Sequence, residues 1–73
     1  LDAPQLPSEA RANLRVALLA EELDELREAI AAADLVGVAD ALCDLQYVLA
    51  GAVLEFGRGE RFKALFDEVQ RSN

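Results

Sequence analysis

Several residue types are scarce in this sequence, and each absence excludes a kind of site. The chain has no histidine and a single cysteine, Cys43, among its 73 residues. Zinc sites are built largely from these two residue types, and the di-iron sites of helical bundles use Glu-x-x-His pairs, so we expect neither here. One cysteine forms no internal disulfide, which favours a reducing compartment, and we expect a cytoplasmic location.

Positive charge and long apolar runs are also scarce. The chain has 7 Lys and Arg residues against 14 Asp and Glu residues, for a formal net charge of −7. Sequence-independent binding of nucleic acid needs clustered basic residues, so we expect no nucleic-acid partner and take a cation as the natural one. The longest uncharged run, residues 45–54, is far shorter than the roughly 20 residues that span a bilayer, so we expect no membrane association.

Apolar residues, in contrast, are abundant. They make up 53% of the chain, above the roughly 45–50% that is typical of globular domains. A domain of this length buries only roughly 60% of the surface that its unfolded chain exposes. We therefore expect self-association, as a homodimer or a dimer of dimers. The chain begins at Leu1 rather than methionine, and we expect it to be the ordered part of a longer protein.

Capping residues predict where two helices begin. Both prolines lie in residues 1–7, which we expect to form an extended lead-in. Ser8 then caps a first helix that runs to about Ala33, and Asp34 caps a second. The connection is so short that the two helices must be antiparallel neighbours.

The second helix is predicted over residues 35–56, with Gly57 as a left-handed residue at its end. Residues 60–71 carry an amphipathic pattern for a short third helix, which we expect to pack across the first two. The predicted fold is a single all-α domain over residues 1–73. It is an antiparallel helical hairpin plus a short third helix, assembling into a four-helix-type bundle by oligomerisation.

Carboxylates interrupt helix faces that should be buried. At about 100° per residue, an apolar stripe follows residues 16–30. Glu22 falls inside this stripe, Glu25 lies at its edge and Glu21 just outside it. Buried carboxylates need a partner. Arg15, one heptad before Glu22 on the same face, is either an ordinary surface residue or a partner for a carboxylate or an anionic ligand.

The second helix is apolar nearly all round, except for a narrow strip that includes Asp40, Asp44 and Gly51. The two aspartates lie one turn apart and repel each other, so a bound cation would explain their presence. Gly51 costs roughly 1 kcal/mol against alanine in mid-helix. This cost suggests a close approach to the backbone, by a crossing helix or by a ligand.

Each of these patterns alone is typical of a solvated helix face. Together, inside apolar helices, they predict a carboxylate-only cation site. Such oxygen ligands suit Mg²⁺ or Mn²⁺, which commonly keep several waters and meet a substrate through its phosphate oxygens.

The motif Glu21-Glu22-x-x-Glu25 followed by Asp40-Ala-Leu-x-Asp44-Leu-x-Tyr47-Val resembles the all-α nucleoside triphosphate pyrophosphohydrolases, the MazG-like and phosphoribosyl-ATP pyrophosphohydrolase-like superfamily. The resemblance covers the first helix through Asn73. It implies Mg²⁺ bound by Glu-x-x-Glu on one helix and Glu-x-x-Asp on the next, and a nucleotide cleaved between its α and β phosphates. Glu22 and Glu25 match the first pair and Asp44 matches the final aspartate.

One ligand position departs from this pattern, because the expected glutamate falls on Ala41. Asp40, one residue earlier, resembles a variant written Asp-Ala-Leu-x-Asp, and is expected to bind the metal or to position a water. Glu21 is either a further ligand or the base that orients the water. Tyr47 either faces the nucleotide or packs in the core. The number of metal ions and the substrate's base and sugar stay open.

The resemblance thus implies a Mg²⁺-dependent nucleoside triphosphate pyrophosphohydrolase, with Mn²⁺ as a possible substitute. The alternative is a non-catalytic acidic helical dimerisation module, whose carboxylates pair only with arginines of a neighbouring copy, such as Arg15 or Arg27. Stabilisation by Mg²⁺ distinguishes the two, because a module without a metal site gains none.

Overall fold

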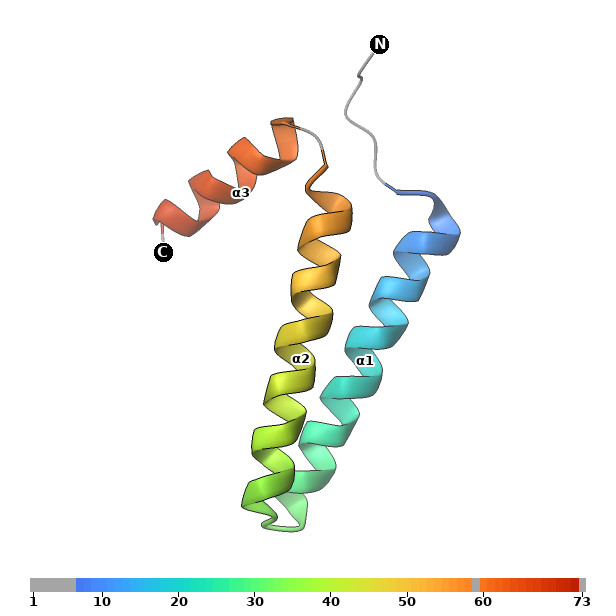
Figure 1. The fold of residues 1–73 in the computed structure, drawn as a ribbon, viewed down its shortest axis with the longest axis vertical. Helices are drawn as coiled ribbons and strands as arrows, with labels where there is room; N and C mark the ends of the chain where they lie inside the picture. The colour runs from blue at the N-terminus through green and yellow to red at the C-terminus, as the bar shows by residue number, and fades with distance from the viewer. Residues whose placement is uncertain (1–6, 59, 73) are drawn as a thin grey trace.

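The structure is a computed structural model that describes residues 7–58 and 60–72. These residues form helices and turns and no strand, which confirms the predicted all-α class. The predicted lead-in falls almost wholly on residues 1–6, outside the described residues. The helices, shown in Figure 1, are α1 (Glu9–Ala31), α2 (Leu35–Phe56) and α3 (Glu60–Ser72).

The first two helices begin at the predicted caps. The Ser8 hydroxyl accepts a hydrogen bond from the Arg11 N–H at 3.2 Å. The Asp34 carboxylate accepts one from the Gly37 N–H at 3.0 Å. Each bond satisfies a backbone donor of the first turn that has no partner within its helix.

The end of α1 lies two residues before its predicted position. Ala33 adopts a left-handed conformation, with φ of 54°. Its N–H donates to the Ile30 carbonyl, and the Asp34 N–H donates to the Ala29 carbonyl, both at 3.0 Å. This pair of bonds closes a helix end around a left-handed residue. Glycine usually takes that place, and because alanine does so here, composition does not reveal the boundary.

The prediction that Gly57 is left-handed is wrong, since its φ is −88°. Its N–H donates to the Val53 carbonyl at 2.7 Å. A Cβ at Gly57 would lie 2.5 Å from that carbonyl oxygen and 3.3 Å from the Phe62 ring. Glycine is needed here for close packing rather than for backbone handedness.

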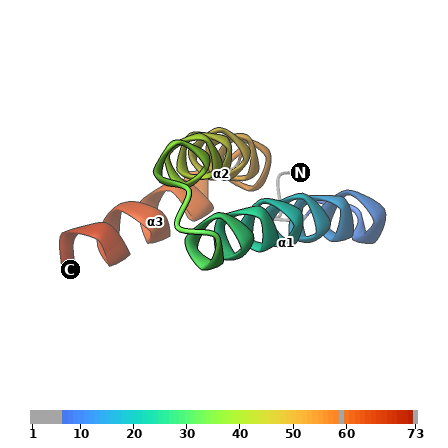
Figure 2. The same ribbon diagram turned by 90° about the horizontal axis from the view of Figure 1, so that it is seen from below.

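The helices α1 and α2 lie side by side and antiparallel, as both views show (Figures 1 and 2). In contrast, α3 extends away from the end of α2 (Figure 1). The prediction that α3 packs across the other two helices is therefore wrong for the single chain. Its apolar face, where the Phe62 and Phe66 rings stack with centroids 5.9 Å apart, is not needed to close the hairpin.

The single chain hides little of its apolar surface. Among the described residues only Ala41 and Ala52 are buried, both on α2 where it packs against α1. A two-helix layer cannot cover both of its sides, so large side chains on every helix stay accessible. These exposed side chains are Leu14, Val16, Leu23, Ile30, Leu35, Val36, Leu42, Tyr47, Leu49, Leu54, Leu65 and Val69.

Candidate metal centre

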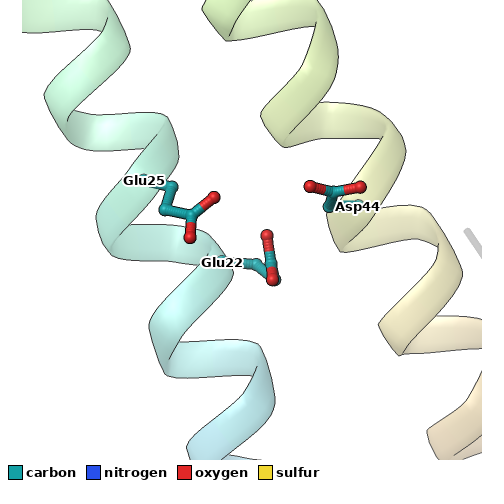
Figure 3. Close-up of side chains that lie close together, drawn as sticks. All are labelled: Glu22, Glu25 and Asp44. Carbon is teal, nitrogen blue, oxygen red and sulfur yellow. The ribbon is translucent and has the colours of Figure 1, made fainter.

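Three of the predicted carboxylates converge between the two long helices. Glu22 and Glu25 project from α1 and Asp44 from α2 into the space that separates them (Figure 3). One carboxylate oxygen of each residue lies within 4.8 Å of the other two. Residues three apart share one helix face, which explains the α1 pair, and the antiparallel hairpin brings Asp44 opposite. We call these three residues the carboxylate cluster.

Glu22 is the member of the carboxylate cluster whose charge is least well compensated. Its Oε1 atom is buried and has no hydrogen-bond partner among the described residues. Loss of hydration raises the pKa of the Glu22 carboxyl, and the nearby charges of Glu25, Asp44 and Glu21 raise it further. Leaving a buried carboxylate oxygen without a partner is costly, so the site calls for a proton or a cation.

The carboxylate cluster fits a divalent cation by its chemistry. Adjacent oxygens around an octahedral Mg²⁺ lie ~3 Å apart. The three oxygens now lie within 4.8 Å of one another, so the side chains would have to draw closer together to hold one ion. All three ligands are hard anionic oxygens, which suit Mg²⁺ or Mn²⁺ and leave coordination positions for water and phosphate. The site needs a positive charge because the buried Glu22 Oε1 atom has no partner among the described residues.

The other two predicted carboxylates lie outside the cluster. Glu21 and Asp40 are both exposed. Glu21 acts on the site through its charge, as the raised pKa of Glu22 shows. Asp40 lies one turn before Asp44 on α2, while Ala41, at the position where the family pattern expects a glutamate, is buried. Roles for Glu21 and Asp40 as ligands or as water-positioning groups stay predictions.

Tyr47 is not a core residue of the single chain. It is 81% exposed on α2, about one turn beyond Asp44. The alternative in which it packs in the chain's own core therefore does not hold. Its ring is available to a nucleotide or to another copy of the chain.

Arg15 does not pair with the carboxylate cluster. Its Nε atom donates to Glu55 Oε1 at 2.6 Å. Arg11 donates to the same carboxylate twice, from Nε to Oε2 at 2.8 Å and from Nη2 to Oε1 at 3.2 Å. Hydrogen bonds from Arg11 and Arg15 lower the pKa of Glu55 to about 2. Two arginines of α1 thus hold one carboxylate of α2.

Sequence reasoning missed this arrangement, although a signal for it exists. Arg11 lies one turn before Arg15, on the α1 face that carries Glu22. Glu55 lies eleven residues after Asp44, close to three turns, so it shares a face of α2 with that ligand. The missing step is the antiparallel register, which places the two arginines opposite Glu55.

The predicted close approach at Gly51 is confirmed. A Cβ at Gly51 would lie 2.7 Å from Arg15 Nη1, much closer than a van der Waals contact. The group that needs the space is thus a side chain of the crossing helix α1. Gly51 allows the Arg15 guanidinium to lie against the backbone of α2.

Acidification should remove the contribution of Glu55 to stability. Its pKa falls from 4.5 to about 2 in the folded chain. A depressed carboxyl pKa stabilises the folded state above the unfolded pKa, and this stabilisation is lost as the pH falls from about 4.5 towards 2. Denaturant melts across this range measure the loss. Glu55→Gln should be less stable than the parent at neutral pH. Its stability should fall less steeply with acid, because its unfolding takes up about one proton fewer in this pH range. Equal slopes in the two proteins would contradict the assignment.

A family model described as phosphoribosyl-ATP pyrophosphohydrolase matches residues 1–73, the whole length of the chain. No curated protein and no solved structure matches.

Proposed function

Because the chain belongs to the phosphoribosyl-ATP pyrophosphohydrolase family, we propose that it cleaves a nucleoside triphosphate between the α and β phosphates. The products would be a nucleoside monophosphate and pyrophosphate. Membership of the family places the chain among nucleotide pyrophosphohydrolases, which are hydrolases. The observation that carries the finer proposal is the carboxylate cluster between α1 and α2, where the buried Glu22 Oε1 atom has no hydrogen-bond partner among the described residues.

Glu22, Glu25 and Asp44 would hold Mg²⁺, or Mn²⁺ in its place. Such a cation neutralises charge that develops on phosphate oxygens and lowers the pKa of a water. The chain's own contribution is to fix three oxygens from two helices at a set spacing. Because Glu22 and Glu25 share one rigid helix, their relative position changes little when a substrate binds.

Glu21 and Asp40 complete the proposed site from its exposed side. Each is an exposed carboxylate that neighbours a cluster residue in sequence or by one helical turn. Either residue can accept the proton of the attacking water and orient its oxygen towards the α phosphorus. We assign the base to Glu21 first, because its charge is felt by Glu22 and it therefore lies near the reacting groups. Tyr47, exposed one turn from Asp44, is placed to contact the nucleoside.

The alternative of a non-catalytic module finds less support. It requires the carboxylates to pair with arginines of a neighbouring copy, Arg15 or Arg27. Arg27 already pairs with Asp24 of its own chain at 3.0 Å, and the Nε of Arg15 already pairs with Glu55 at 2.6 Å, so neither arginine needs a carboxylate of a neighbour for its charge. The test is release of pyrophosphate from a panel of nucleoside triphosphates with Mg²⁺, compared with the same panel in chelator. If no nucleotide is hydrolysed with either metal, the module becomes the better proposal.

We also propose that the chain works as a homodimer or a dimer of dimers, in the cytoplasm and without a membrane or nucleic-acid partner. By length and composition, α2 would also suffice to cross a membrane. Its ionised side chains argue for a protein partner, because charge is costly in a bilayer. Asp44 and Glu55 both lie on α2 and face α1.

Light scattering at micromolar concentration should give at least twice the mass of one chain. The reason is the exposed apolar surface of the described helices, with Leu35 82% and Leu54 75% exposed. A stable interface buries roughly 1,200–2,000 Å² in total, and a second hairpin could cover this surface. The melting temperature should also rise with protein concentration. A monodisperse monomer whose melting temperature is independent of concentration would contradict this prediction.

A further inference from the structure

The two arginines and the carboxylate cluster lie along the same side of the hairpin. Arg15 and Glu22 are seven residues apart, which returns to nearly the same face of α1. Asp44 and Gly51 have the same spacing on α2, and Gly51 is where the Arg15 guanidinium lies. Pairs across the hairpin therefore follow one another in order, with Glu22 opposite Asp44 and Arg15 opposite Gly51 and Glu55.

Arg11, Arg15 and Glu55 together carry one excess positive charge. One arginine would neutralise the Glu55 carboxylate, yet two converge on it. The Arg15 side chain is only 20% exposed, so its charge is partly removed from water. An ion pair that merely joined two helices would not need the second guanidinium, and partial burial of unbalanced charge is costly. The excess positive charge favours an anion at this place, in a chain of net charge −7.

Arg15 also keeps donors that none of the described residues uses. It donates to Glu55 from Nε, and its Nη1 and Nη2 atoms have no acceptor within residues 7–58 and 60–72. Neither of these nitrogens is among the buried partnerless atoms, so both stay open to a ligand. The planar fork of a guanidinium matches the oxygens of a phosphate group and binds them with two parallel hydrogen bonds.

Gly51 leaves room on α2 for the Arg15 guanidinium. A Cβ at Gly51 would lie 2.7 Å from Arg15 Nη1, so any other residue there would push the end of the Arg15 side chain aside. Glycine weakens the middle of a helix. Room for the Arg15 guanidinium against α2 gives a reason for that weakness.

We propose that Arg15, supported by Arg11, binds the terminal phosphates of the substrate, and that the site therefore selects nucleoside triphosphates over monophosphates. Glu55 holds the two guanidiniums in position. Seven helical residues correspond to about 10 Å between the level of Arg15 and that of Glu22. A phosphate chain held at one end by the carboxylate cluster would extend along the helices towards Arg15 over this distance.

This assignment rests on the proposed function and adds a role for its leaving group. When the bond between the α and β phosphates breaks, its electron pair goes to the bridging oxygen of the departing pyrophosphate. The pyrophosphate then carries more negative charge than before, and a guanidinium beside it stabilises that charge. Arg15 is thus a substrate-binding residue at the leaving-group end of the site.

Calorimetric titration with inorganic tripolyphosphate and with orthophosphate, both in excess Mg²⁺, tests the assignment without turnover. Arg15→Gln should weaken tripolyphosphate binding by about 10- to 100-fold, the loss expected for charge-assisted hydrogen bonds. Orthophosphate is too short to contact both Arg15 and the carboxylate cluster, so it should bind the parent much more weakly than tripolyphosphate does. Arg15→Lys should recover part of the affinity, since it keeps the charge but not the fork. Gly51→Ala, which displaces the guanidinium, should also weaken tripolyphosphate binding.

Arg27→Gln is the matched control, because it removes another paired α1 arginine that lies on a different face. Folding is checked by the melting temperature and its rise with Mg²⁺, which Arg15→Gln should retain because Arg11 still pairs with Glu55. The assignment is overturned if the parent does not bind tripolyphosphate. It is equally overturned if Arg15→Gln binds it like the parent, or if Arg27→Gln loses as much affinity.

Failure of this assignment and failure of the proposed function give different results. If the parent releases pyrophosphate from nucleotides while Arg15→Gln keeps full affinity for tripolyphosphate, only the assignment of Arg15 is wrong. If tripolyphosphate binding depends on Arg15 but no nucleotide is hydrolysed, the phosphate site stands and the proposed function is wrong.

Discussion

Glu22→Gln should abolish the stabilisation that Mg²⁺ gives the parent chain and should lower nucleotide turnover by more than about 100-fold. Changes to residues that only orient a metal ligand typically cost 10- to 100-fold, so loss of a ligand should cost more than about 100-fold. For the parent, Mg²⁺ at about a hundred times its dissociation constant adds ~2.7 kcal/mol to the free energy of unfolding. For a domain of this size, each kcal/mol raises the melting temperature by roughly 4–8 °C.

The same substitution should have the opposite effect on stability in chelator. There the ionised Glu22 is partly desolvated and faces the charges of Glu25 and Asp44, which is why its pKa is raised. A carboxyl whose folded pKa is raised destabilises the folded state above that pKa. The neutral amide removes this penalty at nearly constant shape. Glu22→Gln should therefore melt above the parent in chelator and below it in Mg²⁺.

This reversal in the order of the two melting temperatures, between chelator and Mg²⁺, distinguishes a metal site from general charge effects. Glu28→Gln is a suitable control, because it removes one negative charge from an exposed position of α1 outside the carboxylate cluster. It should change the melting temperature similarly in Mg²⁺ and in chelator and should leave turnover intact. If the parent melts at the same temperature in both solutions, or if Glu28→Gln removes the effect of Mg²⁺ as fully as Glu22→Gln, the metal site is wrong.

The sequence determines the helices more closely than it determines their packing. Ser8 and Asp34 mark helix starts because an N-cap is a local event, settled by one side chain and the next three residues. The end of α1 is less visible because Ala33, rather than glycine, adopts the left-handed conformation. An amphipathic pattern shows that one face of α3 is apolar but not which surface that face meets, so the predicted packing of α3 across α1 and α2 is wrong.

In the candidate site, too, single residues are easier to predict than the contacts between them. Glu22 can be identified from the sequence because a carboxylate within an apolar stripe breaks the helical period, and Asp44 because it breaks an apolar helix. Their juxtaposition follows from a short antiparallel connection. The pairing of Arg11 and Arg15 with Glu55 spans 44 and 40 residues along the chain. It depends on the register of α1 against α2, which no local pattern records.

The bond that is cleaved decides between a pyrophosphohydrolase and a phosphatase, because a carboxylate-bound metal suits either reaction. In the proposed site the α phosphate lies at the carboxylate cluster and the terminal phosphates extend towards Arg15. A water held by Glu21 or Asp40 then attacks the α phosphorus, its oxygen stays on the monophosphate and its proton passes to the carboxylate. In ¹⁸O-labelled water with Mg²⁺, phosphorus NMR should find the label in the nucleoside monophosphate and none in the released pyrophosphate.

Each other distribution of the label identifies a different reaction. Label in the pyrophosphate would mean attack at the β phosphorus, and would place the β phosphate rather than the α phosphate beside Glu21. Labelled orthophosphate as the first product would mean attack at the γ phosphorus, and the chain would then act as a phosphatase with its substrate bound in the opposite direction. Arg15→Gln sharpens the distinction. If terminal phosphates are held at Arg15, the variant should react more slowly at low substrate and still place the label in the monophosphate, because the carboxylate cluster alone selects the phosphorus that is attacked.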